Sequence, residues 1–259
     1  MATMKRRCLF FIVRLTLPCL VVAAPGMSLD AQAPGDVLEV QSEGALGTTK
    51  AGMTIEVQQN RITGGHYFVA KDLRDIPITG NIQDVRIVIS GADGSSFDLR
   101  FKSNGSEHGE TLNFDNSVGL IGTCQSSGKV EKIDLGFLTM GQPSSAGRRY
   151  AFTTDLSDLE FESIVREWRL AVLSGNRKEA AKRTHFPLRV NARRKHRTIR
   201  TSAELFIQWD DIFTPVYILR IKKDLPHDMQ GESSSQMVML GAGDVWFDDK
   251  GIEVLNLPD

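Results

Sequence analysis

The sequence predicts an α+β protein, in which an antiparallel β barrel or sandwich is followed by a domain of helices and strands. Three observations lead to this fold class. Apolar and polar residues alternate from Met53 to about Leu138, as they do in half-buried strands. After Gly147 the apolar period changes to the 3.6 residues of a helix, and alternation returns between Gly241 and Asp259. The composition, 41% hydrophobic and 24% charged, is that of a globular protein and not of a disordered one.

The first 33 residues have the features of an export signal. A basic stretch at residues 5–7 precedes an apolar run, and Ala31 to Ala33 has the A-x-A form of a signal-peptidase site. A cleaved signal is favoured over a retained anchor, because no uninterrupted stretch reaches the roughly 20 apolar residues that span a bilayer. A lipid anchor at Cys19 is the third alternative. We therefore expect residues 1–33 to be a signal peptide and the protein to be exported, to the periplasm or outside the cell.

Cysteine and histidine usage predicts neither a disulfide nor a metal site. Without the signal, Cys124 is the remaining cysteine, and its apolar surroundings, "VGLIGTC", predict a buried small hydrophobic residue. The five histidines are scattered without the spacing of zinc ligands, so we expect no metal and no cofactor. A formal net charge of -1 gives no general attraction to nucleic acid, which we do not expect as a partner.

Residues 34–141 form the predicted β domain. Its strands are expected in "MTIEVQ", "RITGGHYFVA", "IPITGNI", "DVRIVIS", "FDLRFKS", "VGLIGTC" and "KIDLGFL". Turn signals separate them, for example at residues 92–95 and 103–105. Regular short strands of this kind indicate an antiparallel barrel or sandwich. Residues 142–154, which open with a Gly-, Pro- and Ser-rich stretch, are the expected linker.

Residues 155–259 form the predicted α+β domain. Ser157 and Glu160 make a capping box that starts a helix, and Gly175 is placed to end it. Asn176 is expected to cap a second, short helix, which the strand "FPLRVN" follows. A second capping box at Thr201 to Glu204 predicts a third helix that carries the apolar residues from Leu205 to Phe213. Thr214-Pro215 then restarts or kinks that helix.

The closing strands are expected in "QMVMLGAGDVWF" and "GIEVLNL". The stretch Asp248 to Gly251 has the composition of a tight turn between the two. Gly241 and Gly243 are expected to allow a strong bend, and Trp246 and Phe247 to point to opposite faces of the sheet.

Two resemblances follow from these patterns. The order helix, short helix, strand, long helix and then strands with "GAGDVWFDDKGI" resembles the NTF2-like, or cystatin-like α+β, superfamily. In that superfamily a curved sheet wraps a long helix and forms a cone. The β half is similar to a β-sheet module of exported bacterial proteins, through Gly65-His66-Tyr67 and the later Ile76-Pro77-Ile78-Thr79-Gly80.

The NTF2-like resemblance implies candidate catalytic residues. Enzymes of the superfamily place an Asp or His inside the apolar cone, where desolvation shifts the pKa toward neutrality. The candidates here are Asp210, Asp211 and His185. Adjacent helical residues point about 100 degrees apart, so at most one of the two aspartates faces a pocket. The alternative for both aspartates is a solvated position, and for His185 a surface or hydrogen-bonded one.

The same resemblance implies an aromatic ligand pocket in the cone. Its candidate residues are Trp168, Trp209, Phe213 and Trp246. Core packing is the alternative for all of them, and we favour it for Trp168.

We expect an exported bacterial protein of two domains that acts as a non-enzymatic binding or envelope-associated module. The expected partner is a small apolar ligand or an envelope protein. A homodimer is compatible with this expectation. We expect no integral membrane span in the mature chain. One alternative is a cofactor-free isomerase, dehydratase or hydrolase that uses a carboxylate in the NTF2-like pocket. Another is an inhibitor or immunity-type protein that uses an exposed edge of the β domain. The basic run from Arg189 to Arg200 is interpreted as a solvated turn and not as a phosphate site.

The export signal gives the first testable prediction. When the full chain is produced in a Gram-negative host, N-terminal sequencing should find a mature chain that begins near residue 34. A cytoplasmic protein that still carries Met1 would contradict this prediction.

Overall fold

The computed structural model describes residues 36–105, 109–143, 147–193, 195–232 and 234–258, and these belong to one compact unit. The signal expected at residues 1–33 lies outside them. The described chain has two parts, a closed antiparallel barrel and a second, mixed sheet covered by helices. Among the described helices, none combines the length and the apolar character needed to cross a membrane.

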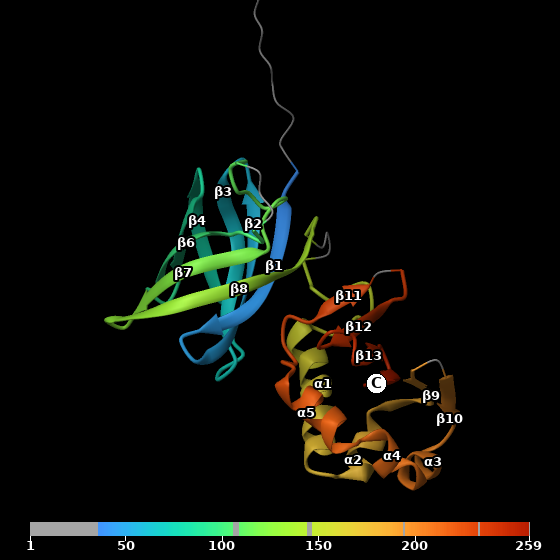
Figure 1. Ribbon diagram of the computed structural model, residues 1–259. Helices are drawn as coiled ribbons and strands as arrows, with labels where there is room; N and C mark the ends of the chain where they lie inside the picture. Colours follow the sequence, from blue (N-terminus) through green and yellow to red (C-terminus); the bar gives the residue numbers. More distant parts are fainter. Residues whose placement is uncertain (1–35, 106–108, 144–146, 194, 233, 259) are drawn as a thin grey trace, which may run out of the picture. The chain divides into compact units, whose positions relative to one another are not determined.

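The first part is an eight-stranded barrel in which each strand pairs with the next and β1 pairs with β8 to close the sheet (Figure 1). The barrel alternative is therefore confirmed over the sandwich. Its strands are β1 (Leu38–Leu46), β2 (Thr49–Gln58), β3 (Arg61–Val69), β4 (Ile76–Gln83), β5 (Arg86–Gly91), β6 (Ser96–Lys102), β7 (Gly119–Ser126) and β8 (Lys129–Gly141).

The interior of the barrel follows the predicted period of two. In the pairing of β5 with β6, Ile87 lies opposite Leu99 and Ile89 opposite Phe97, and all four side chains are buried. Cys124 is buried in the same core, as expected, and burial raises the pKa of its thiol to about 11. The sequence prediction missed β1, because its residues "LEVQSEGAL" offer few large apolar side chains.

A glycine shapes β3 at the point where the register of its pairing shifts. Gly65 has φ +109°, and a Cβ placed on it would lie 2.1 Å from the Thr54 carbonyl oxygen of β2. Only glycine combines this conformation with so close an approach. The irregularity directly precedes His66, whose side chain belongs to the site described below.

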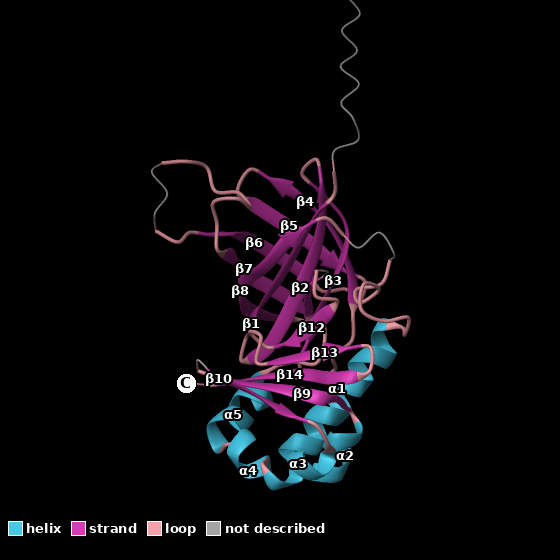
Figure 2. Ribbon diagram, turned by 90° about the vertical axis from the view of Figure 1, so that its right-hand side faces the viewer, coloured by secondary structure: helices cyan, strands magenta, loops and turns pink. Residues whose placement is uncertain are grey.

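The second part is a six-stranded sheet in the order β10-β9-β14-β13-β12-β11, in which β14 pairs with β9 in parallel. The helices lie on one face of this sheet (Figure 2). Its strands are β9 (Thr184–Ala192), β10 (Lys195–Ile199), β11 (Gln230–Glu232), β12 (Met237–Leu240), β13 (Val245–Asp248) and β14 (Gly251–Leu257). Its helices are α1 (Asp158–Leu173), α2 (Arg177–Lys182), α3 (Ser202–Ile207), α4 (Trp209–Ile212) and α5 (Pro215–Lys223).

The predicted helix starts are confirmed, but one helix is broken. Ser157 and Glu160 form the complete capping box of α1, and Asn176 caps α2. The single helix expected from Thr201 to Phe213 is wrong, because it divides at Gln208 into α3 and α4. α5 then restarts with Thr214 as its N-cap and Pro215 in its first turn, as expected.

The closing segment has one more turn than predicted. The stretch "QMVMLGAGDVWF" is two strands, β12 and β13, that pair with each other around residues 241–244. Gly241 and Gly243 adopt φ values of +68° and +87° in this turn, so they reverse the chain where a bend was expected. The hairpin of β13 and β14 around Asp248 to Gly251 is confirmed.

The glycine at position 65 gives a matched test of the barrel. Gly65→Ala forces a Cβ against the Thr54 carbonyl, whereas Gly94→Ala at φ +85° meets nothing within 4 Å. Urea unfolding should show a loss of about 1 kcal/mol for Gly94→Ala, from its left-handed backbone alone, and a clearly larger loss for Gly65→Ala. Equal losses would show that the close approach of β3 to β2 contributes nothing.

Candidate functional site

A cluster of charged and polar side chains joins the barrel to the second part of the chain. The barrel contributes Thr54 and His66 from β2 and β3 and Asp75 from the loop before β4. The second part contributes residues around the start of α1 and around the segment that follows α5. We call the set Thr54, His66, Asp75, Arg149, Tyr150, Asp158, Glu162, His227 and Asp228 the charge cluster.

His227 lies at the centre of the charge cluster, and its side chain is fully buried. Its Nδ1 is 2.6 Å from Glu162 Oε2, and its Nε2 is 2.9 Å from Asp75 Oδ1. Burial alone lowers the pKa of His227, but the hydrogen bonds to Asp75 and Glu162 and their charges outweigh it and raise the pKa to about 9. Both ring nitrogens lie within hydrogen-bond distance of carboxylate oxygens, and a pKa of about 9 makes the ring an imidazolium at neutral pH, in which both nitrogens donate.

Glu162, from α1, is a buried carboxylate whose oxygens are satisfied on every side. The Tyr150 hydroxyl donates to its Oε1 at 2.8 Å, and the Asp228 backbone N–H donates to the same oxygen at 3.1 Å. The Tyr150 oxygen in turn accepts from the Met229 N–H at 2.9 Å. A buried charge of this kind is stable only when it is paired and hydrogen-bonded, and here both conditions hold.

Asp228 connects the two parts of the chain directly. Its Oδ2 accepts from Thr54 Oγ1 at 2.7 Å and lies 3.2 Å from His66 Nε2, while its Oδ1 accepts from Arg149 Nη1 at 3.3 Å. Burial by itself raises the pKa of Asp228, but the hydrogen bond and charge of His66 and the Arg149 guanidinium hold it well below the usual range. Asp228 is therefore ionised throughout the neutral range.

Arg149 binds carboxylates from both parts. Its Nη2 donates to Asp75 Oδ2 at 2.6 Å, and its Nε lies 3.6 Å from Asp158 Oδ2. Asp158, at the start of α1, also accepts from the backbone N–H groups of Arg149 and Tyr150. The side chain of Arg149 is thus held in place by the beginning of the helix that carries Glu162.

A glycine on the barrel surface makes room for an aromatic ring that contacts His227. Phe68 points outward from β3, and its ring meets His227 edge to face with the centroids 4.5 Å apart. A Cβ on Gly52 of β2 would lie 2.4 Å from the Phe68 ring, so Gly52 allows that ring to lie close against the barrel. Asp228 adopts a left-handed conformation at φ 49°, which Asp tolerates better than most residues.

A cavity of about 590 Å³ adjoins the charge cluster, and His66, Asp75, Arg149 and Asp228 lie in its wall. Two further carboxylates of the wall, Glu39 and Glu56, lie directly opposite each other in the pairing of β1 with β2. Neither forms an ion pair with another described residue. Burial and the negative charges of Asp228 and Glu56 raise the pKa of Glu39 and outweigh the opposite effect of the charges of His66 and Arg149.

The cavity has a negative balance of charge. The charge cluster holds four carboxylates, of Asp75, Asp158, Glu162 and Asp228, against the cations of Arg149 and His227, with His66 as its third basic group. Arg148 in the cavity wall donates to the carbonyl oxygens of Thr154 and Leu156. Glu39 and Glu56 bring the count to six carboxylates against four basic groups, namely Arg148, Arg149, His66 and His227, so negative charge is in excess.

The candidate catalytic aspartates are exposed and do not line this cavity. Asp210 is 84% exposed and accepts two hydrogen bonds from Arg177, and Asp211 is exposed as well. The reason is that α4 turns Trp209 and Ile212 toward the core, which leaves the residues between them on the solvent side. The buried carboxylate that the enzyme alternative requires is not at either position.

Three of the four aromatic pocket candidates are packed in the core of the second part, and none of the four lines the cavity beside the charge cluster. Trp168, Trp209 and Phe213 are at most 5% exposed, and the Phe213 ring contacts both tryptophans, with ring centroids 4.3 Å apart for Trp209 and Phe213. Trp246 is half-buried on β13, and its indole N–H donates to the Gly243 carbonyl. The packing alternative is the one that the structure shows for the first three.

His185, the third catalytic candidate, lies near the start of β9 and contacts the Asp248 carboxylate through Nδ1. Together with Glu253 these two residues form a group of potential metal ligands among the described residues.

The residues of the charge cluster were not predicted. "DLPHDMQ", which contains His227 and Asp228, has only the composition of a loop, and its partners are far away in the sequence.

No known protein family, no curated protein and no solved structure matches this chain.

The raised pKa of His227 predicts a pH dependence of stability. A group whose pKa is raised on folding, here from 6.5 to about 9, contributes stability that is complete below pH 6.5 and is lost as the pH rises through 9. The unfolding free energy from urea titrations should fall by a few kcal/mol at most across this window. His227→Gln should remove that fall, whereas His196→Gln, at an exposed position on β10, should keep it. A profile that is flat from pH 6.5 to 9 in the unchanged chain would contradict the imidazolium.

Proposed function

We propose that this chain is an exported, non-enzymatic binding protein whose ligand site is the acidic cavity beside the charge cluster. The observation that carries the proposal is the pair Glu39 and Glu56, which face each other at the cavity and form no ion pair with another described residue. Like charges directly opposite each other in a sheet destabilise it. A bound cation relieves this repulsion, so the free energy of the two carboxylates favours a positively charged ligand.

The ligand class follows from the rest of the wall. Met140, Pro143 and Phe152 also line the cavity, whose volume is within the range of small-molecule sites. An ammonium or guanidinium group fits against the carboxylates, and a short apolar body fits against these three residues. The expected ligand is thus a small amphiphilic cation, which differs from the wholly apolar ligand predicted from the aromatic residues.

The protonation states of the cluster support binding in preference to acid–base catalysis. A general base works best with a pKa near the working pH. The pKa of Asp228 and that of Asp75 are lowered, and that of His227 is raised to about 9, so these groups keep their protons or charges at neutral pH. Asp75 and Asp228 line the cavity, and their hydrogen bonds to His227, Arg149 and His66 hold them in place as part of a fixed wall for a ligand.

The inhibitor alternative is less well supported. It relied on an exposed strand edge of the β domain, and a closed barrel has no free edge. Such a protein would have to use a different surface.

The proposal includes an NTF2-like identity for the second part, and export for the whole chain. The order of α1, α2, β9, then α3 to α5 and the final strands supports the former, as does the covering of one sheet face by helices. The basic stretch and apolar run of residues 1–33 support the latter. Export would place the cavity where it meets solutes outside the cytoplasm.

Calorimetric titration with phenethylamine tests the proposed ligand class. Binding should be measurable for this amine and absent for phenylacetate, which has a similar body and the opposite charge. Glu39→Gln or Glu56→Gln should weaken amine binding about tenfold or more, because each removes a charged partner worth roughly 1.5–3 kcal/mol. Glu131→Gln, the same change at an exposed position of β8, should leave the affinity unchanged. Equal binding of both probes, or no binding of the amine, would overturn the proposal.

A further inference from the structure

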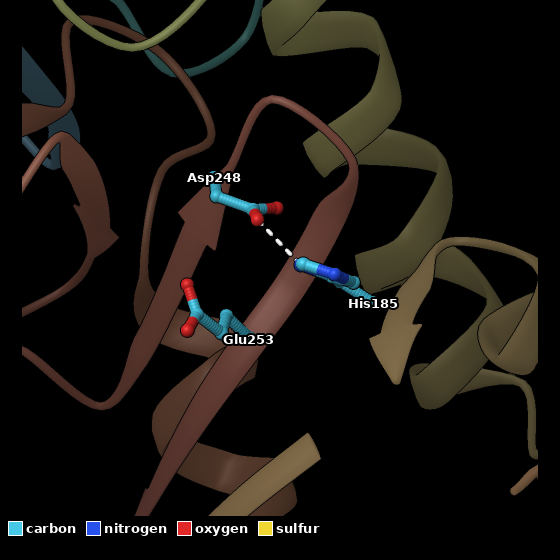
Figure 3. Close-up of side chains that lie close together, drawn as sticks. All are labelled: His185, Asp248 and Glu253. Carbon is cyan, nitrogen blue, oxygen red and sulfur yellow. Dashed lines mark hydrogen bonds and ion pairs between the residues drawn. The ribbon is translucent and has the colours of Figure 1, made fainter. Parts of the chain in front are cut away.

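A second group of side chains lies in the sheet of the second part, apart from the acidic cavity. His185 is near the start of β9, Asp248 ends β13 and Glu253 belongs to β14. One ligand atom of each, a ring nitrogen or a carboxylate oxygen, lies within 4.8 Å of the other two. Figure 3 shows the three side chains close together beside the β13–β14 turn. All three are half-buried, so the group is accessible from solvent.

We propose that His185, Asp248 and Glu253 bind a divalent transition-metal ion of the Zn²⁺ class. No metal was expected from the sequence, because the histidines lack the spacing of zinc ligands. The fold supplies what the spacing does not, since His185 and Asp248 are 63 residues apart in the chain.

The backbone brings β14 close to the residues before His185. Gly251, which opens β14, has φ +136°, and a Cβ on it would lie 2.3 Å from the Arg183 carbonyl oxygen. That oxygen accepts from the Ile252 N–H at 3.0 Å, and Thr184 is paired with Ile252. A glycine at this position therefore allows the hairpin to approach the chain segment that carries His185.

Asp248 is held in the orientation that a metal ligand needs. Its Oδ1 accepts from the backbone N–H groups of Lys250 at 2.9 Å and Gly251 at 3.0 Å. Its Oδ2 is thereby directed to His185 Nδ1. Ligating carboxylates are typically fixed by hydrogen bonds of this kind to their second oxygen.

Glu253 is at an irregularity in both of its strand pairings. The pairing of β14 with β13 passes from Ile252 opposite Phe247 to Val254 opposite Trp246, and that with β9 likewise passes over Glu253. A bulge re-aims a side chain, and bulges are frequent next to functional sites. Within the described residues, the Glu253 carboxylate forms neither a hydrogen bond nor an ion pair, so its oxygens remain available for a ligand.

The donor set selects the kind of ion. One imidazole nitrogen and two carboxylates suit Zn²⁺ and neighbouring transition metals, whereas Mg²⁺ and Ca²⁺ prefer oxygen donors alone. The ion takes the place of the hydrogen between His185 Nδ1 and Asp248 Oδ2. That proton leaves to solvent, and the nitrogen lone pair binds the metal. Three protein ligands leave at least one coordination position for water.

Calorimetric titration of the tag-free full chain with ZnCl₂ tests the site. We expect one ion per chain, with an affinity that an excess of Mg²⁺ does not reduce. His185→Gln and Glu253→Gln should each weaken Zn²⁺ binding about tenfold or more. Even the mutation of a residue that only hydrogen-bonds to a ligand lowers metal affinity roughly 10–100-fold in other metal sites. Asp248 is left unchanged, because its Oδ1 stabilises the turn.

Two matched variants control for unspecific zinc binding. His196→Gln removes an exposed histidine of the neighbouring strand β10, and Asp249→Asn removes an exposed carboxylate next to Asp248. Both should bind Zn²⁺ with unchanged affinity, and far-UV circular dichroism should show all four variants folded. The proposal is overturned if the unchanged chain binds no Zn²⁺, or if folded His185→Gln and Glu253→Gln variants bind it as tightly as the controls.

Discussion

The arrangement of the barrel and the second sheet depends on one buried cation, the His227 imidazolium between Asp75 and Glu162. Its two hydrogen bonds run in opposite directions, one to the barrel and one to α1. Removing either carboxylate leaves a buried charge without its partner, which is among the most destabilising changes that a protein interior can undergo. The same carboxylates are also tied to Arg149 and Tyr150, so the charges of the cluster depend on one another.

The acidic cavity is a consequence of this junction. Thr54 and His66 hold Asp228 against the outer surface of β2 and β3, and Arg149 ties Asp75 to the segment before α1. These contacts form a wall that is charged but satisfied. Glu39 and Glu56 differ, because they lie in the same wall and form no ion pair with another described residue. The proposed binding function rests on this difference: the carboxylates of the charge cluster are paired within the protein, whereas those of Glu39 and Glu56 can bind a ligand.

Local features were predictable from sequence, and long-range ones were not. The strands around Ile87 and Phe97, the cap at Ser157 and the restart at Thr214-Pro215 depend on neighbouring residues, so alternation and capping chemistry revealed them. The charge cluster joins Asp75 to His227, 152 residues later, and no spacing rule covers that distance. Asp210 was a candidate pocket residue because its side of the helix was expected to face a cavity, but α4 turns Trp209 and Ile212 inward and leaves Asp210 exposed.

The central claim concerns the charge of one ring, and nitrogen–proton NMR correlation of the histidine side chains measures it directly. At pH 7.5, with the ring assigned through a His227→Gln variant, both Nδ1 and Nε2 of His227 should carry a proton, each protected from solvent exchange by its carboxylate partner. A spectrum that shows one protonated nitrogen, the signature of a neutral ring, would contradict the account of how the two parts are joined.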